Sequence, residues 1–163
     1  MNQEFTTKKS KGILAMYWSI PIFLTVMLIG IPYWSKDDMS SLEANVFRLA
    51  FAIVLIWFII VLYRIYHMRY LVKNGEITIF GAFNKNVVKL SDIEEIKRSS
   101  IPFGIRLWGG SFVGGRYYLP GIGRAWVAMT NFQDGVLITT RNKEHYVITP
   151  QNPDQFINQV KGQ

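Results

Sequence analysis

The apolar residues of this chain gather in two long stretches near its N-terminus. They cover residues 13–34 and 46–66, and eleven residues separate them. A bilayer core about 30 Å thick is crossed by roughly 20 helical residues, so each stretch is long enough to span a membrane. Aromatic residues fall where such helices would meet the lipid headgroups. The pattern therefore predicts a two-helix transmembrane hairpin.

After about residue 67 the apolar period changes from helical to roughly two, which predicts a strand-rich domain. The pair Asn74-Gly75 lies between two of the predicted strands and is typical of a tight hairpin turn. Short strands at this spacing favour an antiparallel barrel or sandwich. The predicted strands are residues 70–72, 77–80, 87–90, 93–98, 124–130, 136–140 and 145–148.

One helix is predicted at the end of the chain, near residues 153–160. Asn152 suits the N-cap, Pro153 suits the first turn, and Gln155 can return a hydrogen bond to the N-cap. The apolar side chains of this helix share one face, which would lie against the strands. They are Phe156, Ile157 and Val160.

Antiparallel strands followed by one terminal helix resemble the pleckstrin-homology (PH) fold. The glycine pattern and the helix start are similar to those of a bacterial PH-like family that often follows membrane helices. This similarity runs from about His67 to the C-terminus and includes residues 108–116, 121–126, 136–140, 146–150 and 152–157. The resemblance implies a PH-like fold and a membrane context, and the family is not tied to one ligand.

Basic residues lie at the N-terminal end of the first stretch, at Lys8, Lys9 and Lys11, and at the C-terminal end of the second, at Arg64, Arg69 and Lys73, whereas the loop between the stretches is net negative. Lys and Arg near span ends are retained in the cytoplasm, so we expect both termini to be cytosolic. The absence of cysteine agrees with a reducing compartment. We therefore expect a basic cytosolic tail over residues 1–12, a transmembrane hairpin over residues 13–66 and a PH-like domain over residues 67–163, in the cytoplasmic membrane.

Three other interpretations of the apolar stretches fit the sequence less well than the hairpin. A cleaved signal peptide has an apolar region of about 7–15 residues and a small-residue cleavage site, and the first stretch is longer and lacks that site. A core hairpin of a soluble protein would need more partner sequence. A transport pathway, suggested by Pro21, Gly30 and Pro32, would need more than two helices, and neither stretch contains an acidic residue. Arg48 lies near the outer end of the second stretch, where it can reach the interface.

Residues 96–133, here called the acid-free segment, contain no Asp or Glu but five Lys or Arg and seven Gly, interleaved with aromatic residues. Glycine lets backbone amides approach an anion, Arg pairs with phosphate, and Trp or Tyr suits headgroup depth. These properties predict contact with lipid headgroups or an acidic partner. The candidate ligand-binding or membrane-binding residues are Arg106, Trp108, Gly109, Gly110, Gly114, Gly115, Arg116, Arg124 and Trp126.

A structural explanation of the same segment stays open, because glycine also marks bulges and corners in small barrels. If residues 124–130 form a strand, Arg124 and Trp126 share one face and Ala125 and Val127 the other. Eukaryotic PH domains that bind phosphoinositides concentrate basic residues at the first hairpin loop, where this chain has only Lys73. General attraction to anionic lipid is therefore expected rather than phosphoinositide recognition.

Catalytic constellations are not apparent in the sequence. The chain has two histidines and no cysteine, without carboxylates at metal-ligand spacing. The acids Asp92, Glu94 and Glu95 read as a turn that enters an amphipathic strand, and residues 121–123 lack the surroundings of a dinucleotide loop. We expect no enzyme activity, no metal and no cofactor.

The expected function is that of a membrane-anchored binding or assembly module at the cytosolic face. Its expected partners are anionic membrane lipids, a membrane-protein partner or a second copy of the chain. Nucleic acid is not expected, because the excess charge is modest and the domain is held at a membrane. The alternative is a small accessory or regulatory subunit of a membrane enzyme or transporter that acts through its hairpin.

Overall fold

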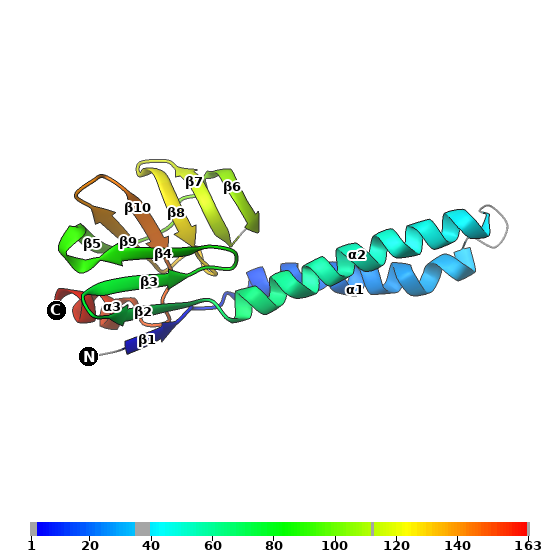
Figure 1. Cartoon of the computed structure of the whole chain (residues 1–163), viewed down its shortest axis with the longest axis horizontal. Helices are drawn as coiled ribbons and strands as arrows, with labels where there is room; N and C mark the ends of the chain where they lie inside the picture. The colour runs from blue at the N-terminus through cyan, green and yellow to red at the C-terminus, as the bar shows by residue number, and fades with distance from the viewer. Residues whose placement is uncertain (1–2, 35–39, 112, 163) are drawn as a thin grey trace. The chain divides into compact units, whose positions relative to one another are not determined.

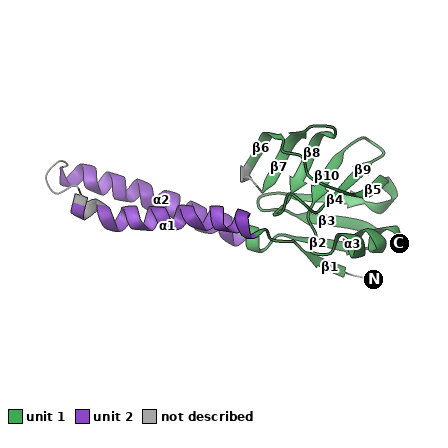
Figure 2. Ribbon diagram, turned by 180° about the vertical axis from the view of Figure 1, so that it is seen from behind, with its two compact units in different colours: residues 1–10, 64–163 green, residues 11–63 purple. Residues whose placement is uncertain are grey.

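A computed structural model of the chain describes residues 3–34, 40–111 and 113–162. The chain divides into two compact units, which are coloured separately in Figure 2. The hairpin unit is Lys11–Tyr63, and the sheet unit combines Met1–Ser10 with Arg64–Gln163.

The hairpin unit contains two long apolar helices, α1 (Lys11–Trp34) and α2 (Ser41–Tyr66), of which the last three residues of α2 belong to the sheet unit. Both are long and apolar enough to cross a membrane over Lys11–Gly30 and Ser41–Tyr66. Their large apolar side chains are mostly exposed, for example Ile29 at 64% and Leu49 at 64%. The core helix of a soluble protein buries such side chains, whereas a lipid-facing helix presents them to acyl chains. The two predicted helices are confirmed, and they associate the protein with a membrane.

Local hydrogen bonds explain how these helices start and continue. Ser40 and Glu43 form a reciprocal capping box at the start of α2, in which the Ser40 amide donates to the Glu43 carboxylate over 2.8 Å and the Glu43 amide donates to Ser40 Oγ over 3.3 Å. Within α1, Thr25 Oγ1 donates to the carbonyl of Pro21 over 2.8 Å.

The sheet unit contains two sheets (Figure 1). The first has four antiparallel strands in the order β1-β2-β3-β4, and the second has six in the order β5-β9-β10-β8-β7-β6. The strands of the first sheet are β1 (Gln3–Thr6), β2 (Arg69–Lys73), β3 (Glu76–Phe80) and β4 (Lys85–Lys89). Those of the second are β5 (Ile93–Ser99), β6 (Ile105–Ser111), β7 (Gly114–Leu119), β8 (Gly123–Ala128), β9 (Gly135–Thr140) and β10 (His145–Ile148). A 3-10 turn, η1 (Leu90–Asp92), precedes β5, and α3 (Pro153–Lys161) ends the unit.

This architecture confirms the predicted fold class, two apolar helices followed by a PH-like β-sandwich with one C-terminal helix. All seven predicted strands are present, with boundaries shifted by up to two residues. The turn between β2 and β3 is the predicted one, because Asn74 and Gly75 both have positive φ, 53° and 75°. One pair departs from antiparallel succession: β10 lies between β8 and β9, so it runs parallel to β8.

Strands β1, β6 and β7 are not predicted by the apolar pattern. Register shifts interrupt β6 between Arg106 and Trp108 and again before Ser111, and glycines replace apolar residues there. In β1 Phe5 is the one apolar residue, so the sequence of this strand shows no alternation of apolar and polar positions.

Phe156 of α3 is one of the fully buried core residues of the sheet unit. Its ring makes edge-to-face contacts with Phe5, at 5.1 Å between centroids, and with Tyr70, at 6.3 Å. The Tyr70 hydroxyl joins the two sheets, because it donates to the Ala128 carbonyl over 2.7 Å and accepts from the Thr149 amide over 3.1 Å.

The predicted helix α3, with Asn152 at its N-cap and Pro153 in its first turn, and the burial of Phe156 are confirmed, but the predicted capping hydrogen bond is not formed. Asn152 makes no side-chain cap bond, and its Nδ2 donates to Gln155 Oε1 over 3.3 Å. The two side chains therefore bond to each other instead of to the backbone.

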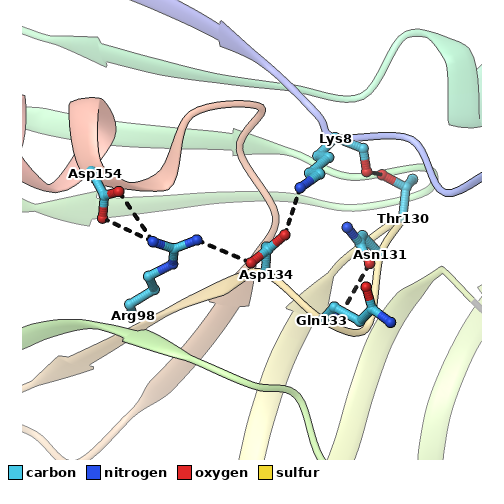
Figure 3. Close-up of polar contacts among 7 residues, drawn as sticks. All are labelled: Lys8, Arg98, Thr130, Asn131, Gln133, Asp134 and Asp154. Carbon is cyan, nitrogen blue, oxygen red and sulfur yellow. Dashed lines mark hydrogen bonds and ion pairs between the residues drawn. The ribbon is translucent and has the colours of Figure 1, made fainter.

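The N-terminal segment, residues 3–10, is part of the sheet unit rather than only a basic tail. Beyond the β1–β2 pairing, the Lys8 amide donates to the Thr149 carbonyl over 2.8 Å and the Ser10 amide to the Thr130 carbonyl over 2.9 Å. Lys8 also pairs with Asp134 (Figure 3). In chain order, the hairpin unit is thus an insertion between two neighbouring strands of one sheet.

Candidate membrane-contact site

Strands β6, β7 and β8 form one end of the six-stranded sheet and carry all nine predicted site residues. In the register, Trp108 lies opposite Arg116, which lies opposite Trp126. In the same way Ile105 lies opposite Tyr118, which lies opposite Arg124. Directly opposed residues project from the same side of a sheet. These two rows therefore form one surface, here called the aromatic–arginine face: Ile105, Trp108, Arg116, Tyr118, Arg124 and Trp126.

Most of this face is open to solvent. Trp108 is 77% exposed, Ile105 is 72% exposed, and Tyr118 and both arginines are also exposed. The alternate residues of β7 and β8 are buried, as Tyr117 and Val127 illustrate. The prediction that Trp126 shares a face with Arg124 is confirmed. Larger exposed apolar patches on folded proteins are often interaction sites, so this surface is a candidate for one.

The face carries positive charge without an acidic side chain of its own. The Arg116 guanidinium lies over the Trp126 ring, 5.2 Å from its centroid, which leaves the charge at the surface. Tyr146 lies beside Trp126 on β10 and donates to Glu144 over 2.9 Å. Burial, followed by the bond to Glu144, raises the pKa of Tyr146 to about 12. The phenol therefore stays neutral, so it adds no charge beside the face.

Two other basic residues of the acid-free segment are neutralised by acids from outside it. Lys97 pairs with Glu95 over 2.9 Å, and Arg98 bridges Asp134 over 3.0 Å and Asp154 over 3.1 Å (Figure 3). Bonds from Lys8 and then Arg98 hold the pKa of the Asp134 carboxyl below its usual value. The segment is free of acids in sequence, but the fold supplies them to these two positions.

Not every predicted site residue lies on the aromatic–arginine face. The register shift between Arg106 and Trp108 places Arg106 opposite the buried Tyr117, and Arg106 is half-buried. Gly110 lies in β6, while Phe112 falls outside the described residues.

Local structure requires glycine at positions 109 and 115. A Cβ at Gly109 would lie 2.6 Å from the Gly114 carbonyl oxygen, and one at Gly115 would lie 2.2 Å from the Trp108 carbonyl oxygen. Both residues also have φ values, +145° and +135°, that other residues rarely adopt. At Gly114 the nearest atom to a Cβ would be 3.6 Å away, an ordinary contact. The close approach of β6 and β7 therefore requires glycine at 109 and 115 but not at 114.

A cavity of about 250 Å³ lies beside the face. It brings together five predicted site residues, Trp108, Gly109, Gly114, Gly115 and Trp126, with Phe83 and Asn84. Phe83 and Asn84 come from the connection between β3 and β4, in the other sheet. Sequence reasoning missed them, because nothing local to residues 81–84 indicates which strands that connection will meet.

The acidic residues Asp92 and Glu94 occupy structural positions, as the sequence predicts. Asp92 ends η1, and Glu94 lies in β5 and pairs with Lys143 over 2.7 Å. Across the described residues, no group of three or more His, Cys, Asp or Glu side chains could hold a metal ion.

The fold and this surface define a membrane-associated protein with a PH-like β-sandwich. The family model described as the bacterial PH domain matches residues 68–163, more than half of the chain, so the chain belongs to that family. No curated protein and no solved structure matches the chain. The family supports a binding or assembly module.

Proposed function

We propose that this protein is a membrane-anchored binding module whose aromatic–arginine face contacts the anionic lipid surface at the cytosolic side of the membrane. The proposal depends on one observation, the alternation of exposed aromatic or apolar residues with Arg116 and Arg124 across three strands. Such a module needs no catalytic group.

The chemistry of the face fits the boundary between water and lipid. Each Lys or Arg near an anionic leaflet contributes about 1 kcal/mol, so the two arginines of the face would supply about 2 kcal/mol. Trp and Tyr rings are favoured at headgroup depth, where their apolar part is shielded and their polar edge stays wet. Neither the arginine charges nor the aromatic rings alone would give firm attachment, but the hairpin already tethers the domain.

The tether consists of two short covalent links. Residues 7–10 join β1 to α1, and residues 67–68 join α2 to β2. A tethered domain meets the bilayer at a high effective concentration, so weak contacts suffice. The face therefore needs to orient the domain rather than to recruit it.

The pairing of β1 with β2 also supports the proposed topology. Gln3 pairs with Val72 and Thr6 with Arg69, although both spans lie between them in sequence. A sheet cannot form across a bilayer, so the flanks of the hairpin would have to be on the same side of it. The basic residues of both flanks favour the cytosol as that side.

The test uses the full-length protein in lipid nanodiscs of phosphatidylcholine, with or without phosphatidylglycerol. The chain has no cysteine, so Ile105→Cys accepts a single polarity-sensitive fluorophore, and Asn142→Cys gives a control position. We expect the emission at position 105 to shift to the blue in anionic nanodiscs and to recover as ionic strength rises, because exposed charges are screened over about 10 Å at 0.1 M salt.

Charge variants complete the experiment. Arg116→Ser with Arg124→Ser should abolish the anionic preference of the position-105 signal. Lys73→Ser with Lys89→Ser, at exposed positions of the first sheet, changes the net charge equally and should preserve it. Equal emission in both kinds of nanodisc, or equal losses in the two double variants, would contradict the proposal.

A further inference from the structure

One row of side chains crosses the end of the first sheet from which both links to the hairpin unit depart. Thr6, the last residue of β1, pairs with Arg69, the first residue of β2. Arg69 also lies opposite Phe80, and Phe80 lies opposite Lys85, the first residue of β4. Arg69 is three residues beyond the end of α2, so its Cα lies within roughly 11 Å of that end. The chain itself therefore holds this end of the sheet close to the ends of both predicted spans.

The two cations of this row share one aromatic ring. The Arg69 guanidinium lies 5.1 Å from the centroid of the Phe80 ring, and the Lys85 ammonium lies 5.5 Å from it. Attraction to the ring holds both cations in place, and both side chains are exposed. Arg69 also pairs with Glu4 over 3.4 Å, whereas Lys85 forms no ion pair within the part of the chain that the structure describes.

Two further cations repeat this arrangement next to the row. Lys9, in the link after β1, lies 4.6 Å from the centroid of the Tyr66 ring. Arg64, in the last turn of α2, lies 5.9 Å from the centroid of the Phe83 ring. Both cations are exposed, and neither pairs with an acid among the described residues. We call the four exposed cations the basic collar: Lys9, Arg64, Arg69 and Lys85.

Phe83 connects the basic collar with the aromatic–arginine face. It lines the cavity of about 250 Å³ together with Trp108 and Trp126 of that face. Because Arg64 lies over Phe83, cations and aromatic rings continue from the face to the last turn of α2. The collar and the face are thus neighbouring surfaces, although they are built on different sheets.

We infer that the basic collar binds anionic phospholipids and retains them at the cytosolic end of the hairpin. This second site rests on the proposed membrane-anchored, cytosolic placement of the sheet unit, and it does not need contact by the aromatic–arginine face. Arg and Lys donate to phosphate oxygens, and aromatic rings beside them suit headgroup depth. The four cations lie over three different rings, an open arrangement that suits the several headgroups of a surface better than one enclosed anion.

The experiment uses the full-length protein in maltoside micelles and native mass spectrometry, which counts the lipid molecules that stay bound. Dioleoylphosphatidylglycerol and dioleoylphosphatidylcholine, which have the same acyl chains, are titrated separately. We expect the phosphatidylglycerol to be retained at lower concentrations than the phosphatidylcholine. Excess glycerophosphoglycerol, the soluble headgroup, should not displace it, because the acyl chains hold each lipid in the micelle beside the collar.

Two matched double variants test the assignment to the collar. Arg69→Ser with Lys85→Ser removes two charges at the start of β2 and of β4. Lys73→Ser with Lys89→Ser removes two charges at the other ends of the same strands and should bind lipid as the parent does. Two unpaired cations near an anionic leaflet are worth about 25-fold in affinity. Because Arg69 shares its charge with Glu4, we expect retention to weaken by about tenfold in the first variant.

A third double variant tests the collar outside the strands. Lys9→Ser with Arg64→Ser leaves every strand residue in place, and neither cation is shared with an acid among the described residues. We therefore expect the full loss of about 25-fold in this variant. Thermal unfolding midpoints equal to that of the parent verify that the variants are folded.

The outcomes separate this inference from the proposed function. Equal retention of the two lipids, equal affinity of the Arg69 and Lys73 double variants, or displacement by the soluble headgroup would overturn the collar as a lipid site. Arg116→Ser with Arg124→Ser should retain the lipid in micelles, and a loss as large as that of the collar variants would assign the lipid to the face instead. The nanodisc signal at position 105 tests the face independently, so either site can fail without the other.

Discussion

Replacing Phe5 with alanine tests whether the N-terminal segment belongs to the folded core of the sheet unit. Phe5 is the buried residue of β1, and its ring meets that of Phe156 edge to face at 5.1 Å. A buried phenylalanine changed to alanine costs about 3–5 kcal/mol. Because β1 is an edge strand, its neighbours can relax into the space left by the Phe5 ring, so we expect a loss of stability of about 3 kcal/mol, at the lower end of that range. This is a large share of a typical stability of about 5–15 kcal/mol.

Native-state hydrogen exchange on the full-length protein in detergent micelles measures this loss. An effect of about 3 kcal/mol raises the opening constant of core amides in β9 and β10 by roughly a hundredfold. Phe103→Ala makes the same chemical change at a side chain that is 89% exposed, and it should alter stability by less than about 0.5 kcal/mol. The double variant with Phe156→Ala should reveal a coupling of about 0.5–1.5 kcal/mol between the two rings.

The refuting result is simple to recognise. If Phe5→Ala exchanges no faster than Phe103→Ala, residues 3–10 would behave as the tail that the sequence predicts. The packing of β1 against α3 would then contribute nothing to the stability of the sheet unit.

Three further predictions follow from buried, charged and topological features. Tyr70→Phe should cost about 1–3 kcal/mol in urea unfolding, because the Ala128 carbonyl and Thr149 amide lose their shared partner; an unchanged midpoint would contradict this. The pKa of Asp134 is lowered from 3.8 on folding, so its stabilisation is full above that pH and is lost as pH falls through the folded value. The difference in stability between the parent and Asp134→Asn should therefore be constant near neutral pH and shrink below about pH 4, and a constant difference into acid would refute it. Reporters fused at Ser40 and at the C-terminus should report opposite sides of the membrane, with the C-terminus cytosolic; cytosolic-type activity at Ser40 would overturn the topology.

Much of the fold follows from local physics that the sequence displays directly. Two apolar stretches of membrane length form helices because a helix satisfies its own backbone in lipid. Asn74-Gly75 forms its hairpin because those residues tolerate positive φ. The helix at Pro153 follows from start signals and one apolar face. Each of these features depends on residues within one element.

The candidate site can be predicted from the sequence only in part. The sequence indicates Trp108, Arg116, Arg124 and Trp126, because an acid-free stretch rich in Arg and aromatics is visible in one dimension. That stretch also includes Lys97 and Arg98, which pair with acidic residues from elsewhere in the fold. It does not include Asn84, which lies in the connection between two strands of the other sheet.

The sequence by itself determined the two long apolar helices, the β-rich domain, its terminal helix and the basic character of the acid-free segment. The tertiary structure alone decided that β1, which precedes α1 and α2, pairs with β2, which follows them. It also decided that β10 lies between β8 and β9 and that the two rows of the aromatic–arginine face align across three strands. These features depend on pairing between residues far apart in the chain. Register and strand order are set by the packing of whole layers, and no single segment carries the free energy that selects them.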